Sequence, residues 1–121
     1  MTVSFEGIGE KLATFYNTAT TANRAVKNQP VKVTDSGEVS KCAAGERFMG
    51  VALTADSGFV AVQFAGYVEQ PYTGTPPAAG YAYLVANGTG GVKTDTAQTH
   101  VGGEFLVIEV DKTNGVLGFI L

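Results

Sequence analysis

The sequence holds few side chains that could carry out catalysis. Its single cysteine, Cys42, and single histidine, His100, supply at most two of the three or four nitrogen and sulfur ligands of a zinc site. Its serines lie outside the strand-to-helix context of a hydrolase nucleophile. Cys42 is predicted to be a partly buried apolar residue and His100 an exposed loop residue. We therefore expect no enzyme activity, no metal and no cofactor.

Glycines and aspartates form two further patterns that could bind ligands. The segment 88–91, Gly-Thr-Gly-Gly, has the composition of a phosphate loop, but no Lys-Ser or Lys-Thr pair and no helix follows it. The aspartates fall in predicted turns, where their side chains bond to nearby backbone, and their spacing does not bring several together for calcium. These aspartates are Asp35, Asp56, Asp95 and Asp111.

Tyrosines border a proline-rich segment, residues 69–80, and could recognise a ligand. Flat tyrosine rings can stack on sugar faces; alternatively, these rings pack the segment against the domain and keep their hydroxyls in water. The prolines preset backbone angles, so the segment is predicted to be stiff. The candidate recognition residues are Tyr72, Pro76, Pro77 and Tyr81.

Composition limits the remaining classes of function. At 121 residues, 45% hydrophobic and 16% charged, the chain suits one folded domain with a sparsely charged surface. A net charge of -3 and the lack of any Lys/Arg cluster argue against a nucleic-acid partner. No apolar stretch approaches the roughly 18 residues of a membrane span, and residues 1–10 do not resemble a signal peptide. We expect a protein that is soluble when made and has no membrane partner.

Short strands separated by turns are predicted from residue 24 onward. The clearest is a hairpin over residues 48–68, with the turn Thr54-Ala55-Asp56-Ser57-Gly58 between two alternating apolar runs. Similar runs precede this hairpin at 31–34 and 38–42 and follow it at 81–86 and 105–110. One turn signal every eight to ten residues or so is typical of a sandwich or barrel, and predicts an all-β fold.

The last predicted strand, Val116 to Leu121, is apolar at every position except Gly118. A strand that is apolar on both faces is buried on both. In so small a domain, we expect one face to pack inside a barrel and the other against another subunit. The expected subunit contacts are Val116, Leu117, Phe119 and Leu121, together with part of the strand predicted over residues 105–110, which carries Leu106, Ile108 and Val110 on one face.

Residues 1–23 differ from the β domain predicted for residues 24–121. They contain two glycines, a polar tract and apolar side chains partly at helical spacing. The segment is either an unstructured terminus or an arm ordered by a partner surface. The arm hypothesis predicts that deleting residues 1–14 leaves the fold intact and abolishes partner binding. The expected arm contacts are Phe5, Ile8, Leu12, Phe15 and Tyr16.

The order of turn and core patterns over residues 24–121 resembles the head-decoration proteins of tailed bacteriophages, which are also called capsid cement or auxiliary capsid proteins. The similar segments are Pro30-Val31-Lys32-Val33, the Gly37 turn, Phe48-Met49-Gly50-Val51-Ala52, Gly66-Tyr67-Val68, Gly80 before Tyr81, Phe105-Leu106-Val107 and the final apolar strand.

This resemblance implies a small β-barrel or tulip-like β-sandwich with an extended N-terminal arm. It implies a homotrimer on the outer surface of the virion, at three-fold or quasi-three-fold sites, where it binds the major capsid protein and stabilises the shell. Proteins of this family are not enzymes, and they are made in the bacterial cytoplasm. The alternative function is a carbohydrate-binding or a spike- or tail-associated recognition module that uses the tyrosine-bordered segment.

Overall fold

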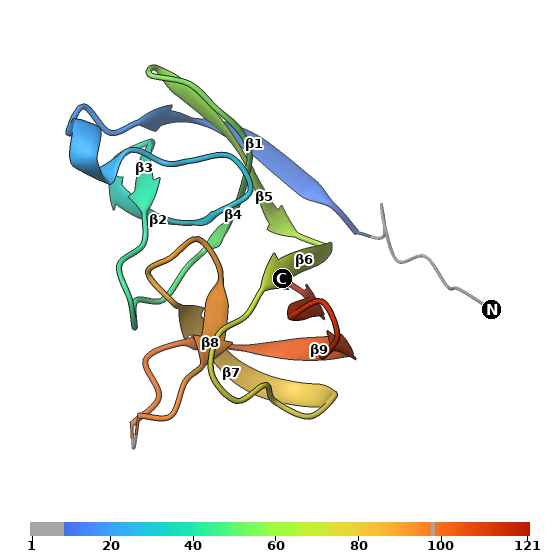
Figure 1. Ribbon diagram of the computed structural model, residues 1–121. Coiled ribbons are helices and arrows are strands. Elements are labelled where there is room, and N and C mark those ends of the chain that lie inside the picture. The colour runs from blue at the N-terminus through green and yellow to red at the C-terminus, as the bar shows by residue number, and fades with distance from the viewer. Residues whose placement is uncertain (1–8, 98) are drawn as a thin grey trace.

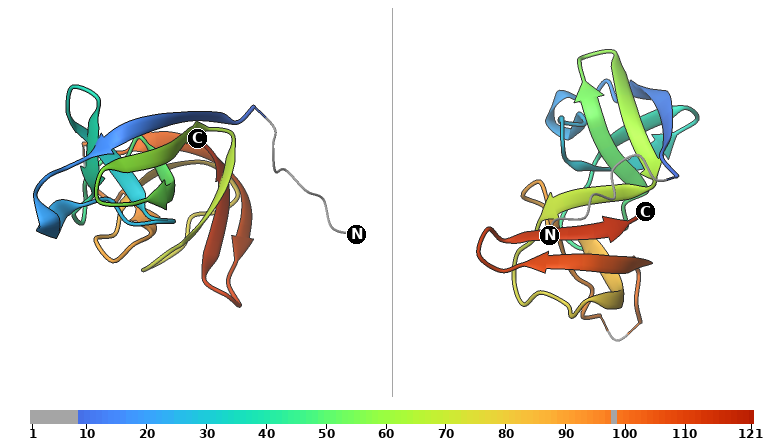
Figure 2. Two further views of the ribbon diagram at one scale, coloured as in Figure 1. Left: turned by 90° about the horizontal axis from the view of Figure 1, so that it is seen from above. Right: turned by 90° about the vertical axis from the view of Figure 1, so that its right-hand side faces the viewer.

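The computed structural model describes residues 9–97 and 99–121, and its regular structure is almost entirely β (Figure 1). Strands within residues 11–65 form a closed five-stranded barrel, and strands within residues 67–120 form a second five-stranded sheet. Figure 2 shows the two as separate lobes that meet where the chain crosses from one to the other. The prediction of a small all-β barrel or sandwich is confirmed.

The barrel has the strand order β1-β3-β2-β4-β5 and is closed by pairing of the first strand with the last. The first strand lies antiparallel to β5 and parallel to β3. One short 3-10 helix, η1 (Thr21–Asn23), follows the first strand. The barrel strands are β1 (Lys11–Asn17), β2 (Pro30–Asp35), β3 (Glu38–Lys41), β4 (Gly50–Ala55) and β5 (Phe59–Ala65).

Branched aliphatic side chains fill the barrel, as alternation along its strands requires. The half-buried ring of Phe15 packs against this core from β1. Val33 and Phe64, by contrast, project into solvent. The buried core consists of Ala25, Val31, Val39, Ala52, Val60 and Val62.

The predicted hairpin over residues 48–68 is confirmed for β4 and β5, which pair across the turn at 56–58. Its second strand is shorter than predicted. The chain turns at Gly66, whose φ of 93° is a conformation that favours glycine, and Val68 then belongs to the second sheet. A single alternating run therefore supplies one strand to each lobe.

The second sheet has the strand order β6-β10-β9-β7-β8. A bridge between Tyr72 and Val92 joins the end of its first strand to its last, so the sheet curls around its own core. The strands are β6 (Tyr67–Pro71), β7 (Gly80–Ala86), β8 (Val92–Thr94), β9 (Gly103–Asp111) and β10 (Val116–Ile120).

Aromatic rings fill the core of the second sheet. Phe48 stacks on Phe105 with ring centroids 5.0 Å apart, and both rings contact Phe119 on β10. Phe48 and Val51 come from the barrel side of the chain but are buried in this second core. The two lobes are therefore held together by shared hydrophobic packing.

Two glutamine side chains form hydrogen bonds between the lobes. Gln70 on β6 donates from Nε2 to the carbonyl oxygen of Asn28 in the barrel lobe, at 3.0 Å. Gln63 on β5 donates from Nε2 to the carbonyl oxygen of Tyr67, at 3.1 Å. Because both side chains are buried, these bonds also fix which strands of the two lobes face each other.

Candidate partner-binding surfaces

The structure places the two side chains with nucleophilic or basic chemistry in different surroundings. Cys42 is buried in the core of the second sheet, and burial, together with the nearby Glu46 carboxylate, raises the pKa of its thiol to about 12. Only the thiolate is a nucleophile, so this cysteine remains an unreactive thiol at neutral pH. His100 instead lies on an exposed loop, where its ring stacks on Tyr83 at a centroid distance of 4.1 Å.

A buried carboxylate organises the loop that carries His100. Asp95 accepts backbone N–H bonds from Ala97, Val101 and Gly102 at 2.8 to 3.0 Å, and His100 Nδ1 lies 3.8 Å from its Oδ2. These bonds, above all the one from Gly102, lower the pKa of Asp95. The predicted turn role of this aspartate is confirmed, and the arrangement is structural because the N–H donors occupy both carboxylate oxygens.

The part of the chain that the structure describes offers neither a cluster of metal ligands nor a membrane-spanning helix. No group of three or more His, Cys, Asp and Glu side chains there is arranged to hold a metal ion. No helix there is long and apolar enough to cross a membrane.

The segment predicted to be an arm begins the barrel instead. Phe5 and Ile8 lie outside the described residues, but residues 11–17 form β1, which pairs with β5 along its length. The boundary predicted at residue 23 is therefore wrong. Deleting residues 1–14 would remove paired barrel residues, so we no longer expect that deletion to leave the fold intact. Leu12 and Phe15, two of the apolar positions that suggested helical spacing, lie on opposite faces of this strand.

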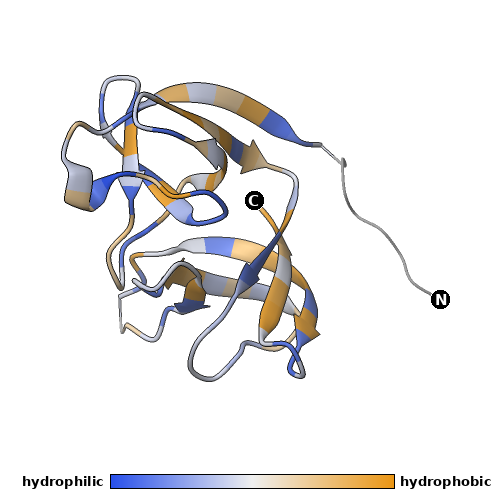
Figure 3. Ribbon diagram, turned by 45° about the horizontal axis from the view of Figure 1, so that its top comes forward, coloured by the Kyte–Doolittle hydropathy of each residue, from blue (hydrophilic) through white to orange (hydrophobic). Residues whose placement is uncertain are grey.

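The outward face of β1 carries the first candidate binding surface. Leu12 and Tyr16 are exposed, whereas Phe15 faces the barrel core, so the predicted contacts divide between two faces. Tyr16 pairs with Phe59 of β5, and their rings lie 5.6 Å apart. The exposed fractions are 55%, 62% and 56% for Leu12, Tyr16 and Phe59. We call these three residues the barrel strip; Figure 3 shows the hydrophobic stretches of β1.

The expected subunit contacts on β10 are mostly internal. Leu117 and Phe119 are fully buried in the core of the second sheet, so the prediction that they face another subunit is wrong. Val116 and Leu121 are half-buried. The strand is apolar on both faces because it is central in its sheet, and the Tyr67 ring covers Gly118 on the outer face.

A second exposed apolar surface crosses the outer face of that sheet. Pairing places Ile120 of β10 beside Leu106 of β9, and Leu106 beside Tyr81 of β7. Exposure increases along this row: Ile120 is half-buried, Leu106 is exposed, and Tyr81 is 73% exposed. We call these three residues the sheet row. It lies in the same sheet as the predicted subunit contacts Leu117 and Phe119, but on the face opposite to these two side chains.

The tyrosine-bordered segment is only partly available for recognition. Tyr72 is half-buried against the second core, and its backbone N–H donates to the Gly115 carbonyl oxygen at 3.0 Å. Pro76 and Pro77 are also half-buried. Tyr81 is the one predicted recognition residue whose ring is open to solvent, and it projects from the same strand as Tyr83.

No family model and no curated protein sequence matches the chain. The geometry of its own surfaces must therefore carry any argument about function.

Sequence reasoning missed Phe59 of the barrel strip, and it included Leu106 of the sheet row only as part of a strand expected to contribute to the subunit contact, without singling it out. Phe59 follows the hairpin turn directly, and its alternation with the buried Val60 and Val62 signals an outward ring. Leu106 alternates in the same way with the inward-facing Phe105 and Val107. Both signals were present, but which residues are neighbours across strands depends on register, which the sequence does not display.

Proposed function

We propose that this protein is a capsid decoration protein of a tailed bacteriophage, which binds the outer surface of the mature shell as a homotrimer and stabilises it. The observation that carries the proposal is the pair of separate exposed apolar surfaces, the barrel strip and the sheet row, on one compact β scaffold. The turn and core patterns that resemble decoration proteins, including Phe48 and Phe105, support the same function from the sequence.

A trimer can use the sheet row as one of the two patches that join its copies. In a closed ring of three copies, each copy presents two different patches, one to each neighbour. The sheet row, with Leu106 at its centre, provides an apolar patch on the outer face of the second sheet. We assign it to the contact between copies, in place of the buried side chains of β10.

The barrel strip is assigned to the major capsid protein. Leu12 and Tyr16 of the strip lie on β1, and Phe59 lies on the paired strand β5. Phe5 and Ile8, which precede β1 in the sequence, were expected to contact the capsid as well. Burying Leu12, Tyr16 and Phe59 contributes on the order of 1.5 to 3 kcal/mol each before the cost of association. Three copies on one rigid trimer would bind with avidity, so modest single contacts suffice.

Expanded and unexpanded capsids that lack decoration would test this function. Purified protein is mixed with each, and both samples are imaged by cryo-electron microscopy. Density at three-fold or quasi-three-fold positions on expanded shells is the expected result. Bare shells in both samples would refute the capsid role.

A second candidate function is a carbohydrate-binding or a spike- or tail-associated recognition module. It is favoured by the exposed Tyr81 ring next to Tyr83, whose own ring is stacked on His100. Flat exposed rings of this kind bind sugar faces. Binding to a glycan array that Tyr81→Ala abolishes and Tyr72→Phe preserves would support this function. An array without signal would remove it.

A further inference from the structure

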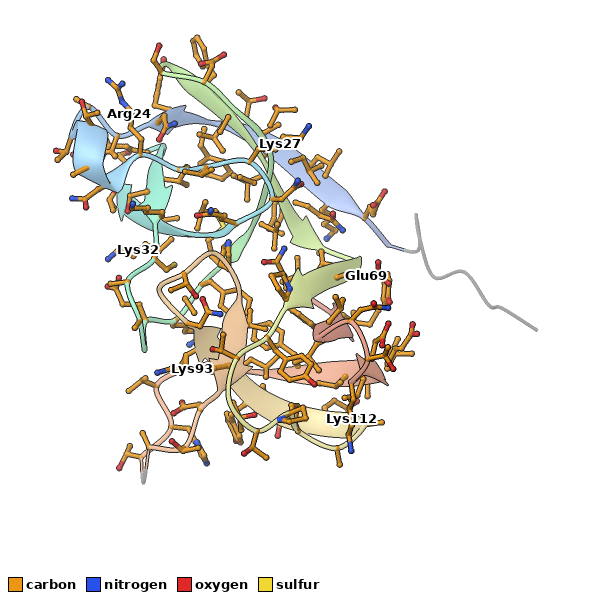
Figure 4. All side chains as sticks on the ribbon, viewed as in Figure 1. Arg24, Lys27, Lys32, Glu69, Lys93 and Lys112 are labelled. Atoms are coloured by element: carbon orange, nitrogen blue, oxygen red, sulfur yellow. The ribbon has the colours of Figure 1, made fainter. Side chains whose placement is uncertain are left out.

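A cleft of about 510 Å³ lies between the barrel and β6, separate from both exposed apolar surfaces. Its buried residues come from both lobes, and its exposed rim carries two carboxylates, Glu10 and Glu69. Figure 4 shows Glu69 on β6, below the end of β5. The residues that line the cleft are Glu10, Asn28, Val51, Leu53, Gln63, Tyr67, Val68, Glu69, Gln70 and Pro71.

Gln70, one of the residues that line the cleft, has an unsatisfied hydrogen-bond acceptor in its side chain. The side chain is 2% exposed, and its Oε1 is buried with no hydrogen-bond partner among the described residues. The amide orientation is fixed, because Nε2 donates to the Asn28 carbonyl oxygen and a flipped amide would place two acceptors against each other. A buried acceptor without a partner is costly, so a donor from a ligand would be strongly favoured at this position.

The charges around the cleft select the sign of that ligand. Among the residues that the structure describes, no Lys, Arg or His lines the cleft, while Glu10 and Glu69 do. Residues 66–121 carry two basic and five acidic residues, a net charge of -3, whereas residues 9–65 carry six basic and five acidic residues, a net charge of +1. Tyr67 donates to one oxygen of Glu69 at 3.0 Å, which holds that carboxylate at the rim and leaves its other oxygen for a further donor.

The apolar part of the lining selects the shape of the ligand. Val51 and Leu53 lie on one strand of the cleft, and Val68 lies on β6. A side chain that has an apolar stem and a cationic head of several donors matches such a lining better than a small cation does. Arginine has this form, with five N–H donors in a planar fork.

We propose that the cleft binds an arginine side chain of a partner protein. The stem packs on Val51 and Leu53, and the guanidinium pairs with Glu10 and Glu69. One N–H donates to Gln70 Oε1 after a small side-chain movement opens the floor of the cleft. The inference goes beyond the proposed capsid role, since any partner with an exposed arginine satisfies it.

The experiment uses the isolated full-length protein, so its result is independent of capsid binding. Uniformly ¹⁵N-labelled protein is titrated at low salt with the peptide acetyl-Ala-Arg-Ala-amide. The same peptide with citrulline, which keeps the shape but loses the charge, is the control probe. We expect saturable shifts of the Gln63 and Gln70 side-chain amide signals with the arginine peptide, and binding at least about threefold weaker with citrulline.

Matched variants locate the site. Gln70→Met removes the acceptor at similar size and should weaken arginine binding at least about tenfold, as expected for a hydrogen bond to a charged group. Glu10→Gln and Glu69→Gln change only exposed groups and should each weaken it about threefold. Glu104→Gln, the same change outside the cleft, should leave it unchanged.

Three outcomes would overturn the proposal. The first is the absence of a saturable shift at Gln63 and Gln70, which would mean that the cleft holds only water. The second is equal affinity for the two peptides. The third is that the Glu10→Gln/Glu69→Gln double variant binds the arginine peptide as tightly as the Glu104→Gln variant does. This comparison can be made even if Gln70→Met fails to fold.

Discussion

At the scale of single residues, Asp95 shows how one carboxylate replaces regular structure. The loop between β8 and β9 has no strand, and its backbone N–H groups at Ala97, Val101 and Gly102 bond to this side chain instead. Because those bonds favour the ionised form, the pKa of Asp95 lies below its ordinary value of 3.8. The hydrogen bonds of Asp56 and Asp111 lower the pKa of each in the same direction.

The lowered pKa of Asp95 gives a prediction for acid stability. The ionised carboxylate stabilises the folded state fully above the unfolded pKa of 3.8, and this contribution is lost as the pH falls through the lower folded pKa. Asp95→Asn should therefore lower the melting temperature at neutral pH. The difference in melting temperature between wild type and this variant should be smaller at about pH 3. Thermal unfolding at both pH values measures this difference. The same difference at both pH values would contradict the prediction.

Gly118 supports a second prediction at this scale. A side chain there would overlap the Tyr67 ring, so Gly118→Ala should destabilise the protein by about 1–3 kcal/mol, as overpacking does. Denaturant unfolding measures the change. Gly58→Ala, whose added Cβ meets only ordinary contacts, is the control and should have a smaller effect. In a protein that already carries Tyr67→Ala, Gly118→Ala should cause little further loss of unfolding free energy. If the two substitutions instead lower the unfolding free energy additively, the overlap between residue 118 and the Tyr67 ring is contradicted.

At the scale of elements, β1 is the strand that sequence reasoning did not find. Its alternation is short, and the neighbouring glycines and polar tract weaken the signal. The strand forms because β5 offers a long partner edge, a tertiary effect that local propensity does not display. The strong alternation of β4 and β5, with a turn signal between them, made the central hairpin predictable.

Two neighbouring substitutions test the strand assignment of β1. Phe15→Ala removes a ring that packs on the barrel core and should cost about 2–3 kcal/mol of unfolding free energy, somewhat less than a fully buried ring. Leu12→Ala, on the outward face, should cost less than about 0.5 kcal/mol. Chemical denaturation gives both values. Equal costs would mean that the two side chains do not lie on opposite faces.

At the scale of the whole molecule, the all-β class was predictable because turn signals recur along most of the chain. The division into two lobes was not, since Gly66 redirects a single alternating run from one sheet to the other. The candidate surfaces were found only in part: Leu12, Tyr16 and Tyr81 were predicted contacts that prove to be exposed. Leu117 and Phe119 were also predicted contacts, but they are buried. A strand that is apolar on both faces can lie in the interior of its own sheet as well as at a contact between subunits.

The association of copies of this protein into a trimer can be tested by a substitution in the sheet row. If the sheet row joins copies, Leu106→Glu should convert a trimer to a monomer, because it places a charge at an apolar contact. Sedimentation of wild type and variant measures this. Tyr16→Ser, on the barrel strip, is the matched control and should leave the trimer intact while weakening capsid binding. A wild-type protein that stays monomeric at every concentration, or a trimeric Leu106→Glu variant, would contradict the assignment.

The consecutive placement of the two lobes along the chain sets the order in which they can be completed during translation. All five barrel strands are present once Ala65 has been made, so the barrel can close while the ribosome is still synthesising the rest. The second sheet begins with β6 but cannot pair it until β10 arrives, because β10 separates β6 from β9. The nascent β6 is thus an unpaired edge beside a finished barrel, and the interval before β10 emerges is when this chain is most exposed to aggregation.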